Sequence, residues 1–255
     1  FALWIKAKPE TLMQWQSPWG MGFPGWHIEC SAMSAKYLGQ EFDIHGGGMD
    51  LAATHHTNEI AQSEACSRHQ PAKYWMHTNM LTVNGTRMSK SKGNGFLPGE
   101  LFTGNHPLLN KGYSPMTVKF FMLQAHYRST LDFSNEALEA SEKGFRRLMN
   151  ALSLLPKLVA NDEGTIAIDP IKENCIKAMN DDFNSPVVIA ELFEAVRIIN
   201  TVYDGTAKIN AAELDKLKTL MNDFVFEVFG LKDEDSSNTE LNEVLDMVIA
   251  LRKDA

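Results

Sequence analysis

Cysteine is scarce in this sequence of 255 residues, which contains only Cys30, Cys66 and Cys175. Three cysteines are too few for a disulfide-stabilised secreted scaffold, so we expect a protein of the reducing cytoplasm. No apolar run reaches the roughly 18 residues that cross a bilayer, and we expect no membrane partner. Charged residues make up 22% and hydrophobic residues 44% of the chain, which excludes a disordered or low-complexity polymer.

Histidine and tryptophan are absent from residues 134–255, which also hold only 4 of the 17 glycines. This part carries 23 acidic against 13 basic residues, whereas residues 1–133 carry 9 acidic against 11 basic residues. The shift predicts two domains, a site-bearing domain at 1–133 and a helical one at 134–255. The net charge of −8 argues against broad nonspecific binding to nucleic acid, but not against a local basic contact.

The first part mixes short apolar runs with glycine and proline. Residues 81–83 followed by Asn84-Gly85 predict a strand that enters a tight turn. Helical patterns cover residues 55–66, with Thr54 as the expected N-cap, and residues 116–127.

From residue 134 onward, apolar residues recur almost throughout at helical spacing, which predicts an antiparallel bundle without a catalytic constellation. Proline in the first turn and glycine after the last turn are typical of helix boundaries. The expected boundaries are a stop at Pro156, starts at Asp169-Pro170, Ser185-Pro186, Asn210 and Thr239, and a stop at Gly230.

The segment HHTNE places His55 and Glu59 four residues apart, on one face of a helix. An imidazole and a carboxylate there can share a metal ion, and Cys30 can add a thiolate from elsewhere. Such a set favours zinc over calcium or magnesium, because hard ions prefer all-oxygen shells. The alternative is that His55 caps the helix and Glu59 is solvated, and the spacing alone leaves both open.

Two other stretches have the composition of ligand-binding loops. Residues 87–94 (RMSKSKGN) offer hydroxyls, backbone N–H groups and the Lys90 ammonium to a polyphosphate. In residues 45–50 (HGGGMD), the glycines let the main chain approach a flat ring or sugar, and Asp50 can accept a ribose hydroxyl. The respective alternatives are a solvated loop and a plain tight turn.

Taken in order, these stretches resemble the cysteinyl-tRNA synthetases, a family of class I aminoacyl-tRNA synthetases. The resemblance covers nearly the whole chain and implies the C-terminal half of a Rossmann-type α/β catalytic domain, followed by an all-α helical bundle that contacts tRNA. The stretches that carry it are GWHIECSAM (25–33), HGGGMDL (45–51), HHTNE (55–59), YWMH (74–77), RMSKSKGN (87–94), HYRS (126–129) and DDFNSP (181–186).

The resemblance implies a zinc ion held by two cysteines, a histidine and a glutamate, and Cys30, His55 and Glu59 match three of these ligands. The zinc would bind the thiolate of substrate L-cysteine, which serine cannot imitate. Trp26 matches the aromatic wall of the amino-acid pocket, and His45 a position beside the zinc.

The resemblance also implies binding of ATP with magnesium, for which we expect Gly47, Gly48, Asp50 and Lys90. Asp50 matches a position near the ribose, and Lys90 the second lysine of the KMSKS signature, which stabilises charge on the departing pyrophosphate. Arg87 replaces the first lysine of that signature, keeping the charge and changing its geometry. The implied reaction forms cysteinyl-adenylate and transfers the cysteine to the terminal ribose of tRNA(Cys).

Two family features do not occur in this sequence: the first zinc-binding cysteine and the HIGH signature that handles ATP phosphates. We therefore expect an internal-to-C-terminal part of a longer synthetase, without its anticodon-binding segment. By itself it should be inactive in ATP–pyrophosphate exchange and bind zinc weakly.

Three other functions compete with this interpretation. A cysteine ligase of mycothiol biosynthesis shares the zinc pocket and the signature loops, but couples cysteine to an amino sugar. A zinc hydrolase would leave the RMSKS stretch unexplained and lacks the HExxH spacing. A non-catalytic tRNA-binding fragment is the third alternative.

Overall fold

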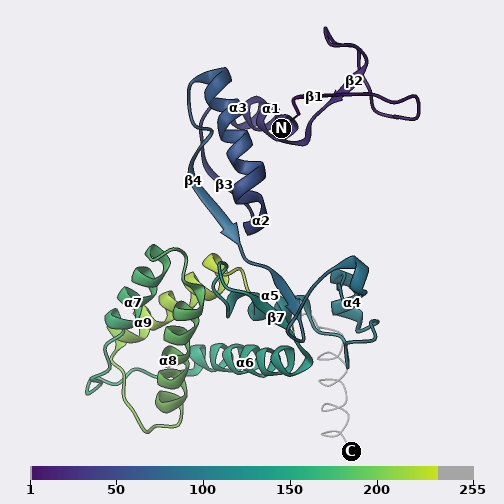
Figure 1. The fold of residues 1–255 in the computed structure, drawn as a ribbon. Helices are drawn as coiled ribbons and strands as arrows, with labels where there is room; N and C mark the ends of the chain where they lie inside the picture. Colours follow the sequence, from purple (N-terminus) through teal and green to yellow (C-terminus); the bar gives the residue numbers. More distant parts are fainter. Residues whose placement is uncertain (1, 235–255) are drawn as a thin grey trace, which may run out of the picture. The chain divides into compact units, whose positions relative to one another are not determined.

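The computed structural model describes residues 2–234, and for Lys90 the backbone alone. Contacts divide the chain into two compact units (Figure 1). The first unit comprises residues 1–80 and 127–130, and the second comprises residues 81–126 and 131–255. The domain boundary that composition predicts at residue 133 is not the boundary between these two units, and it stays a prediction.

The first unit opens with a short antiparallel pair, β1 (Trp4–Lys6) and β2 (Gly22–Pro24), in which Trp4 lies opposite Pro24. Helix α1 (Trp26–Leu38) follows directly after Gly25 and contains Cys30 in its second turn. Helix α1 packs against helix α3 (Thr57–Ser67). Residues 26–38 and residues 57–67, which are separated in the sequence, therefore lie next to each other.

A β–α–β crossover forms the rest of the first unit. Strand β3 (Phe42–Gly48) is parallel to β4 (Ala72–Thr78), with Phe42 opposite Ala72 and Gly48 opposite Thr78. Between them runs an unbroken helical segment made of α2 (Met49–Leu51), a π-helical turn η1 (Ala52–His56) and α3. Parallel strands require such a crossover, so this unit has the α/β architecture that the sequence predicts.

Two local expectations in this unit are wrong. The glycines at 46–48 lie in strand β3 and not in a tight turn, because each is paired with a residue of β4. The strand passes directly into the helical segment at Met49, so Thr54 lies inside the π-helical turn and is no N-cap. Pairing with a neighbouring strand overrides the local preference of glycine for turns.

The second unit begins with a three-stranded sheet in the order β6-β5-β7. Strands β5 (Leu81–Val83) and β6 (Thr86–Arg87) are antiparallel, and β7 (Leu131–Phe133) is parallel to β5. Asn84 and Gly85 connect β5 to β6 with φ angles of 49° and 73°, which confirms the expected tight turn. The RMSKSKGN stretch follows from this hairpin through the short turn η2 (Lys90–Lys92).

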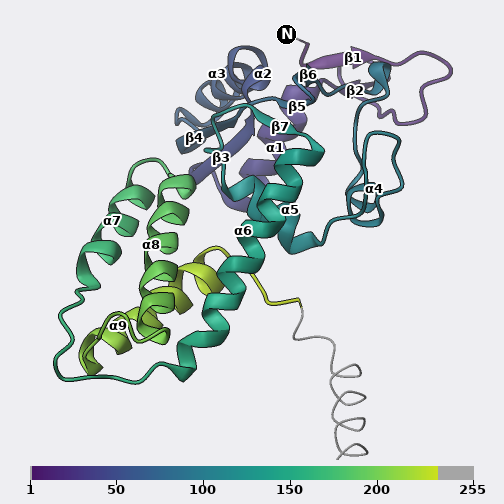
Figure 2. The same cartoon turned by 90° about the horizontal axis from the view of Figure 1, so that it is seen from below.

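Helices make up the remainder of the described second unit (Figure 2). Helix α8 (Ser185–Tyr203) packs against α5 (Pro115–Leu123), α6 (Asn135–Leu154), α7 (Asp169–Asn180) and α9 (Ala211–Met221). Ile199 of α8 and Leu217 of α9 are fully buried. The expected helix starts after 134 are confirmed, except that Thr239 lies outside the described residues. The bounds are α4 (Pro98–Thr103), α5 (Pro115–Leu123), α6 (Asn135–Leu154), η3 (Leu155–Lys157), α7 (Asp169–Asn180), α8 (Ser185–Tyr203), α9 (Ala211–Met221) and η4 (Asn222–Val228).

Capping follows the sequence signals closely. The Asn210 side chain accepts a hydrogen bond of 3.0 Å from the N–H of Glu213 at the start of α9, and Gly230 takes a φ of 57° after η4. Pro170 and Pro186 lie in the first turns of α7 and α8. Within residues 2–234, no helix is long and apolar enough to cross a bilayer.

Candidate metal centre

Helix α1 and the segment from η1 to α3 carry a group of metal-binding side chains in the first unit. Cys30 is half-buried on α1, whereas His55, His56 and Glu59 are only 4%, 3% and 2% exposed. The π-helical turn inserts an extra residue into the helix, and it allows two consecutive histidines to be buried. His45 joins the group from strand β3.

The structure brings Cys30, His55 and Glu59 together, with one ligand atom of each within 4.8 Å of the others. Nε2 of His55 lies 3.0 Å from Oε1 of Glu59. Despite this short distance, Oε1 is buried and accepts no hydrogen bond from any residue within 2–234. A buried carboxylate oxygen that lies beside an imidazole nitrogen without a hydrogen bond between them is a place where a cation fits.

Glu59 also belongs to a second group. His45, His56 and Glu59 have ligand atoms within 4.8 Å of one another, and Nε2 of His45 lies 3.5 Å from Oε2 of Glu59. The two carboxylate oxygens thus face different histidines. The sequence analysis placed His45 beside the metal but assigned no role to His56.

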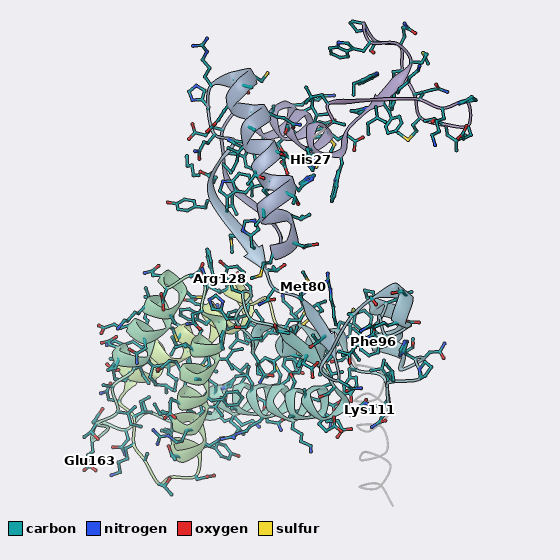
Figure 3. All side chains as sticks on the ribbon, viewed as in Figure 1. His27, Met80, Phe96, Lys111, Arg128 and Glu163 are labelled. Carbon is teal, nitrogen blue, oxygen red and sulfur yellow. The ribbon has the colours of Figure 1, made fainter. Side chains whose placement is uncertain are left out.

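Two outer histidines, His27 and His77, make side-chain contacts with the inner histidines His55 and His56. Figure 3 labels His27, which lies in the first turn of α1, and Nδ1 of this residue lies 2.7 Å from Nδ1 of His55. Nε2 of His77 on β4 lies 2.8 Å from Nδ1 of His56. Hydrogen bonds of this kind fix the tautomer and orientation of metal-binding imidazoles. Sequence reasoning assigned no role to either outer histidine, although both lie in stretches that carry the resemblance, GWHIECSAM and YWMH.

An aromatic side chain lies over the site. The Trp26 ring is centred 4.1 Å from the His55 ring and remains 59% exposed, so it can cover a ligand beside that histidine. The position agrees with a wall of a small pocket, although the role of Trp26 in binding cysteine stays a prediction.

Burial dominates the electrostatics of this cluster. It lowers the pKa of His56 to about 4, with His45, His77 and His55 adding to the effect, and it lowers the pKa of His55. It also raises the pKa of Glu59 to about 7 and that of the Cys30 thiol. The imidazoles are therefore neutral at pH 7, and a bound cation would favour the ionised carboxylate and thiolate.

The donor set fits zinc. One sulfur, one imidazole nitrogen and one carboxylate oxygen are ligands that zinc accepts, and a zinc ion held by these three residues has room for the further cysteine that the resemblance implies. The assignment of Cys30, His55 and Glu59 as zinc ligands remains a prediction that this geometry supports.

The glycines before the helix make room for side chains of the cluster. A Cβ on Gly47 would lie 2.8 Å from Cε1 of His56, and a Cβ on Gly48 would lie 2.5 Å from Oδ1 of Asp50. Asp50 itself is exposed in the first turn of α2. A role of these three residues in binding ATP stays a prediction.

In the second unit, Asn94 closes the RMSKSKGN stretch. Its side chain, 8% exposed, accepts a hydrogen bond of 2.9 Å from the N–H of Ser89 and donates one of 3.2 Å to the carbonyl of Arg87. Asp132 of β7 stabilises the preceding hairpin by accepting a bond of 2.8 Å from the N–H of Gly85. Neither residue was singled out from sequence.

Comparison with protein families gives two matches. Residues 1–143 match the class I tRNA synthetase (C) catalytic domain, and residues 174–232 match the DALR domain. Together they describe a mixed α/β synthetase domain followed by a helical region, as the sequence predicts.

Curated relatives are similar over essentially the whole chain. A cysteine–tRNA ligase of Porphyromonas gingivalis is 52% identical over 259 residues, which cover 100% of this chain and 53% of that protein. Those of Bacteroides thetaiotaomicron and Cytophaga hutchinsonii are also 52% identical, with 53% and 50% of their lengths covered. The chain thus spans about half the length of the curated relatives it matches.

Solved structures support the fold. The LeuRS of Agrobacterium radiobacter K84, in a ternary complex with tRNA and LeuAMS, aligns with a TM-score of 0.55 at 15% identity, over 84% of this chain and 31% of that one. A putative arginyl-tRNA synthetase of Campylobacter jejuni aligns with a TM-score of 0.50 at 13% identity, over 83% and 52%. From these matches and the fold, the chain belongs to the class I tRNA synthetase (C) catalytic-domain family.

Proposed function

We propose that this chain supplies the cysteine-recognising and signature-loop parts of a cysteine–tRNA ligase. The observation that carries the proposal is the convergence of Cys30, His55 and Glu59 from two helices, with Oε1 of Glu59 buried and unbonded beside Nε2 of His55. The relatives named cysteine–tRNA ligase support the same assignment.

Selection of cysteine would rest on these three ligands. When bound, zinc supplies a soft Lewis acid that favours a thiolate ligand over the hydroxyl of serine. Cys30, His55 and Glu59 would hold the ion, and His27 would keep the His55 ring in place. Trp26 and His45 would line the pocket for the rest of the amino acid.

Activation of the carboxylate needs positioning and charge neutralisation more than acid–base chemistry. Lys90 would neutralise charge on the pyrophosphate of ATP, with Gly47, Gly48 and Asp50 contacting the nucleotide. Asn94 would act as a positioning residue, because it joins both ends of the segment that contains Lys90. Magnesium would accompany ATP as in other phosphate-transferring sites.

The complete reaction would be formation of cysteinyl-adenylate and its transfer to tRNA(Cys), with the helical region contacting the tRNA. A cytoplasmic location remains a prediction. Because the sequence contains no HIGH signature, we expect the 255-residue chain to show no ATP–pyrophosphate exchange. Exchange above the background of a Lys90→Ala variant would contradict this expectation.

Cobalt substitution tests the zinc assignment directly. We expect Co²⁺ bound to the chain to show a thiolate-to-metal charge-transfer band that Cys30→Ser removes and that the matched variant Cys66→Ser retains. Added L-cysteine should intensify this band, whereas L-serine should leave it unchanged, because only cysteine brings a second thiolate. Absence of the band, or equal responses to the two amino acids, would refute the proposal.

A further inference from the structure

We propose that His45, His56 and Glu59 form a second position for a divalent cation, adjoining the position at Cys30 and His55. Glu59 would give one carboxylate oxygen to each ion. The recognition of cysteine proposed above uses a metal ion only at the Cys30 position, so this second position is an additional metal site.

The geometry of Glu59 carries the inference. Oε1 lies 3.0 Å from Nε2 of His55, and Oε2 lies 3.5 Å from Nε2 of His45. A carboxylate whose oxygens face separate imidazoles has the arrangement of a bridging ligand, and ions held in this way lie about 3.5–4 Å apart. Glu59 also belongs to two trios, one with Cys30 and His55 and one with His45 and His56, in each of which one ligand atom per residue lies within 4.8 Å of the others.

The shared carboxylate is buried. The Glu59 side chain is 2% exposed, and its Oε1, which faces His55, has no hydrogen-bond partner among the described residues. A buried carboxylate without compensating donors is costly. A cation at the first position would satisfy Oε1, and the approach of His45 to Oε2 from another element provides the second position.

The outer contacts repeat at the two positions. Nε2 of His77 lies 2.8 Å from Nδ1 of His56, and Nδ1 of His27 lies 2.7 Å from Nδ1 of His55, so each inner histidine has one outer histidine as a partner. Strand pairing fixes His77, which lies opposite Gly47 in the parallel ladder. An outer group that orients each inner imidazole is a regular feature of metal sites.

The donor atoms define the class of ion. Two imidazole nitrogens and a carboxylate oxygen, without sulfur, suit Zn²⁺, Co²⁺ or Ni²⁺. The second ion should bind more weakly than the first, because two cations then share the single negative charge of Glu59.

Metal binding to the 255-residue chain, measured by equilibrium dialysis with Co²⁺ together with absorption spectra, tests the proposal. We expect the unmodified chain to bind two equivalents of Co²⁺. The control His69→Ala, whose imidazole is exposed in the same unit, should bind two equivalents as well. His45→Ala should keep one equivalent with the thiolate band. Cys30→Ser should keep one equivalent without the band, and Glu59→Gln should weaken both.

Saturation of the unmodified chain at one equivalent would overturn the second position, as would two equivalents retained in His45→Ala. Loss of all binding in both His45→Ala and Cys30→Ser would also overturn it, since it would show a single centre made of all the ligands. His56→Asn provides the same comparison should His45→Ala fail to fold, judged by circular dichroism. Binding of two equivalents of Co²⁺ without a thiolate-to-metal band would contradict the assignment of Cys30 as a ligand and would still support a second cation position.

Discussion

Nδ1 of His27 and Nδ1 of His55 lie 2.7 Å apart, so a single proton is shared between them. Nε2 of His55 makes no hydrogen bond to Oε1 of Glu59 although it lies only 3.0 Å away. The arrangement is explained if His55 carries its proton on Nδ1 and donates a hydrogen bond from there to Nδ1 of His27. Nε2 is then the lone-pair nitrogen that a metal requires.

Replacement of His27 should therefore weaken metal binding without removing a ligand. We expect His27→Ala to lower Co²⁺ affinity by about 10–100-fold, the usual effect of losing an outer partner of a ligating histidine. Competition titration with a chromophoric chelator measures the change. His69→Ala is the control, and an unchanged affinity in His27→Ala would show that His27 does not orient His55.

The three thiols should react at very different rates. Cys66 is exposed, whereas Cys175 is fully buried and its burial raises the thiol pKa to about 12. We expect one fast thiol in a reaction with a disulfide reagent, removed by Cys66→Ser, and no reaction of Cys175 before unfolding. Cys30 should react at an intermediate rate that Zn²⁺ suppresses, and equal rates with and without Zn²⁺ would argue against it as a ligand.

Gly47 and Gly46 form a matched pair for testing why glycine is needed in β3. A Cβ at Gly47 would lie 2.8 Å from Cε1 of His56, whereas a Cβ at Gly46 would meet its nearest atom, the carbonyl oxygen of Met76, at 3.7 Å. We expect Gly47→Ala to lower the free energy of unfolding by about 1–3 kcal/mol through overpacking. Gly46→Ala should be close to neutral, and equal effects in urea unfolding would exclude packing against His56 as the reason.

Asn94 should control the order of the RMSKSKGN stretch. Asn94→Ala removes both side-chain hydrogen bonds and should cost about 1–3 kcal/mol of local stability, since Asn94 is buried. Faster hydrogen exchange at residues 88–93 is the measurement. Asn94→Asp keeps the acceptor for Ser89 and should show a smaller effect; no change in either variant would mean that the backbone alone holds the loop.

A polar contact between α7 and α9 should make stability depend on pH. Oε2 of Glu213 accepts a bond of 2.7 Å from the N–H of Ile168, and Oε1 lies 2.8 Å from Nζ of Lys216. The bond from Lys216, followed by that from Ile168, lowers the pKa of Glu213. This stabilisation is present above the pKa of the unfolded chain and is lost as pH falls through the folded value. The stability difference from Glu213→Gln, measured in urea at pH 3–7, should shrink at the acidic end.

The sequence by itself determined the elements whose signals are local. Pro170 and Pro186 fixed helix starts, Asn210 a cap, and Asn84-Gly85 a hairpin turn, because each acts on its own backbone or on its nearest neighbours. The spacing of His55 and Glu59 likewise follows from one helix. The resemblance to the cysteinyl-tRNA synthetases added Cys30, which spacing alone could only suggest.

Tertiary structure decided everything that depends on partners distant in the chain. The glycines at 46–48 became a strand because β4 pairs with them, and the helical segment then began at Met49 and not after Thr54. His27, His56 and His77 joined the site only because α1, η1 and β4 meet there. These histidines lie in stretches that carry the resemblance, but their contacts with one another could not be predicted, since burial and the approach of a second ring arise from packing and not from neighbours along the chain.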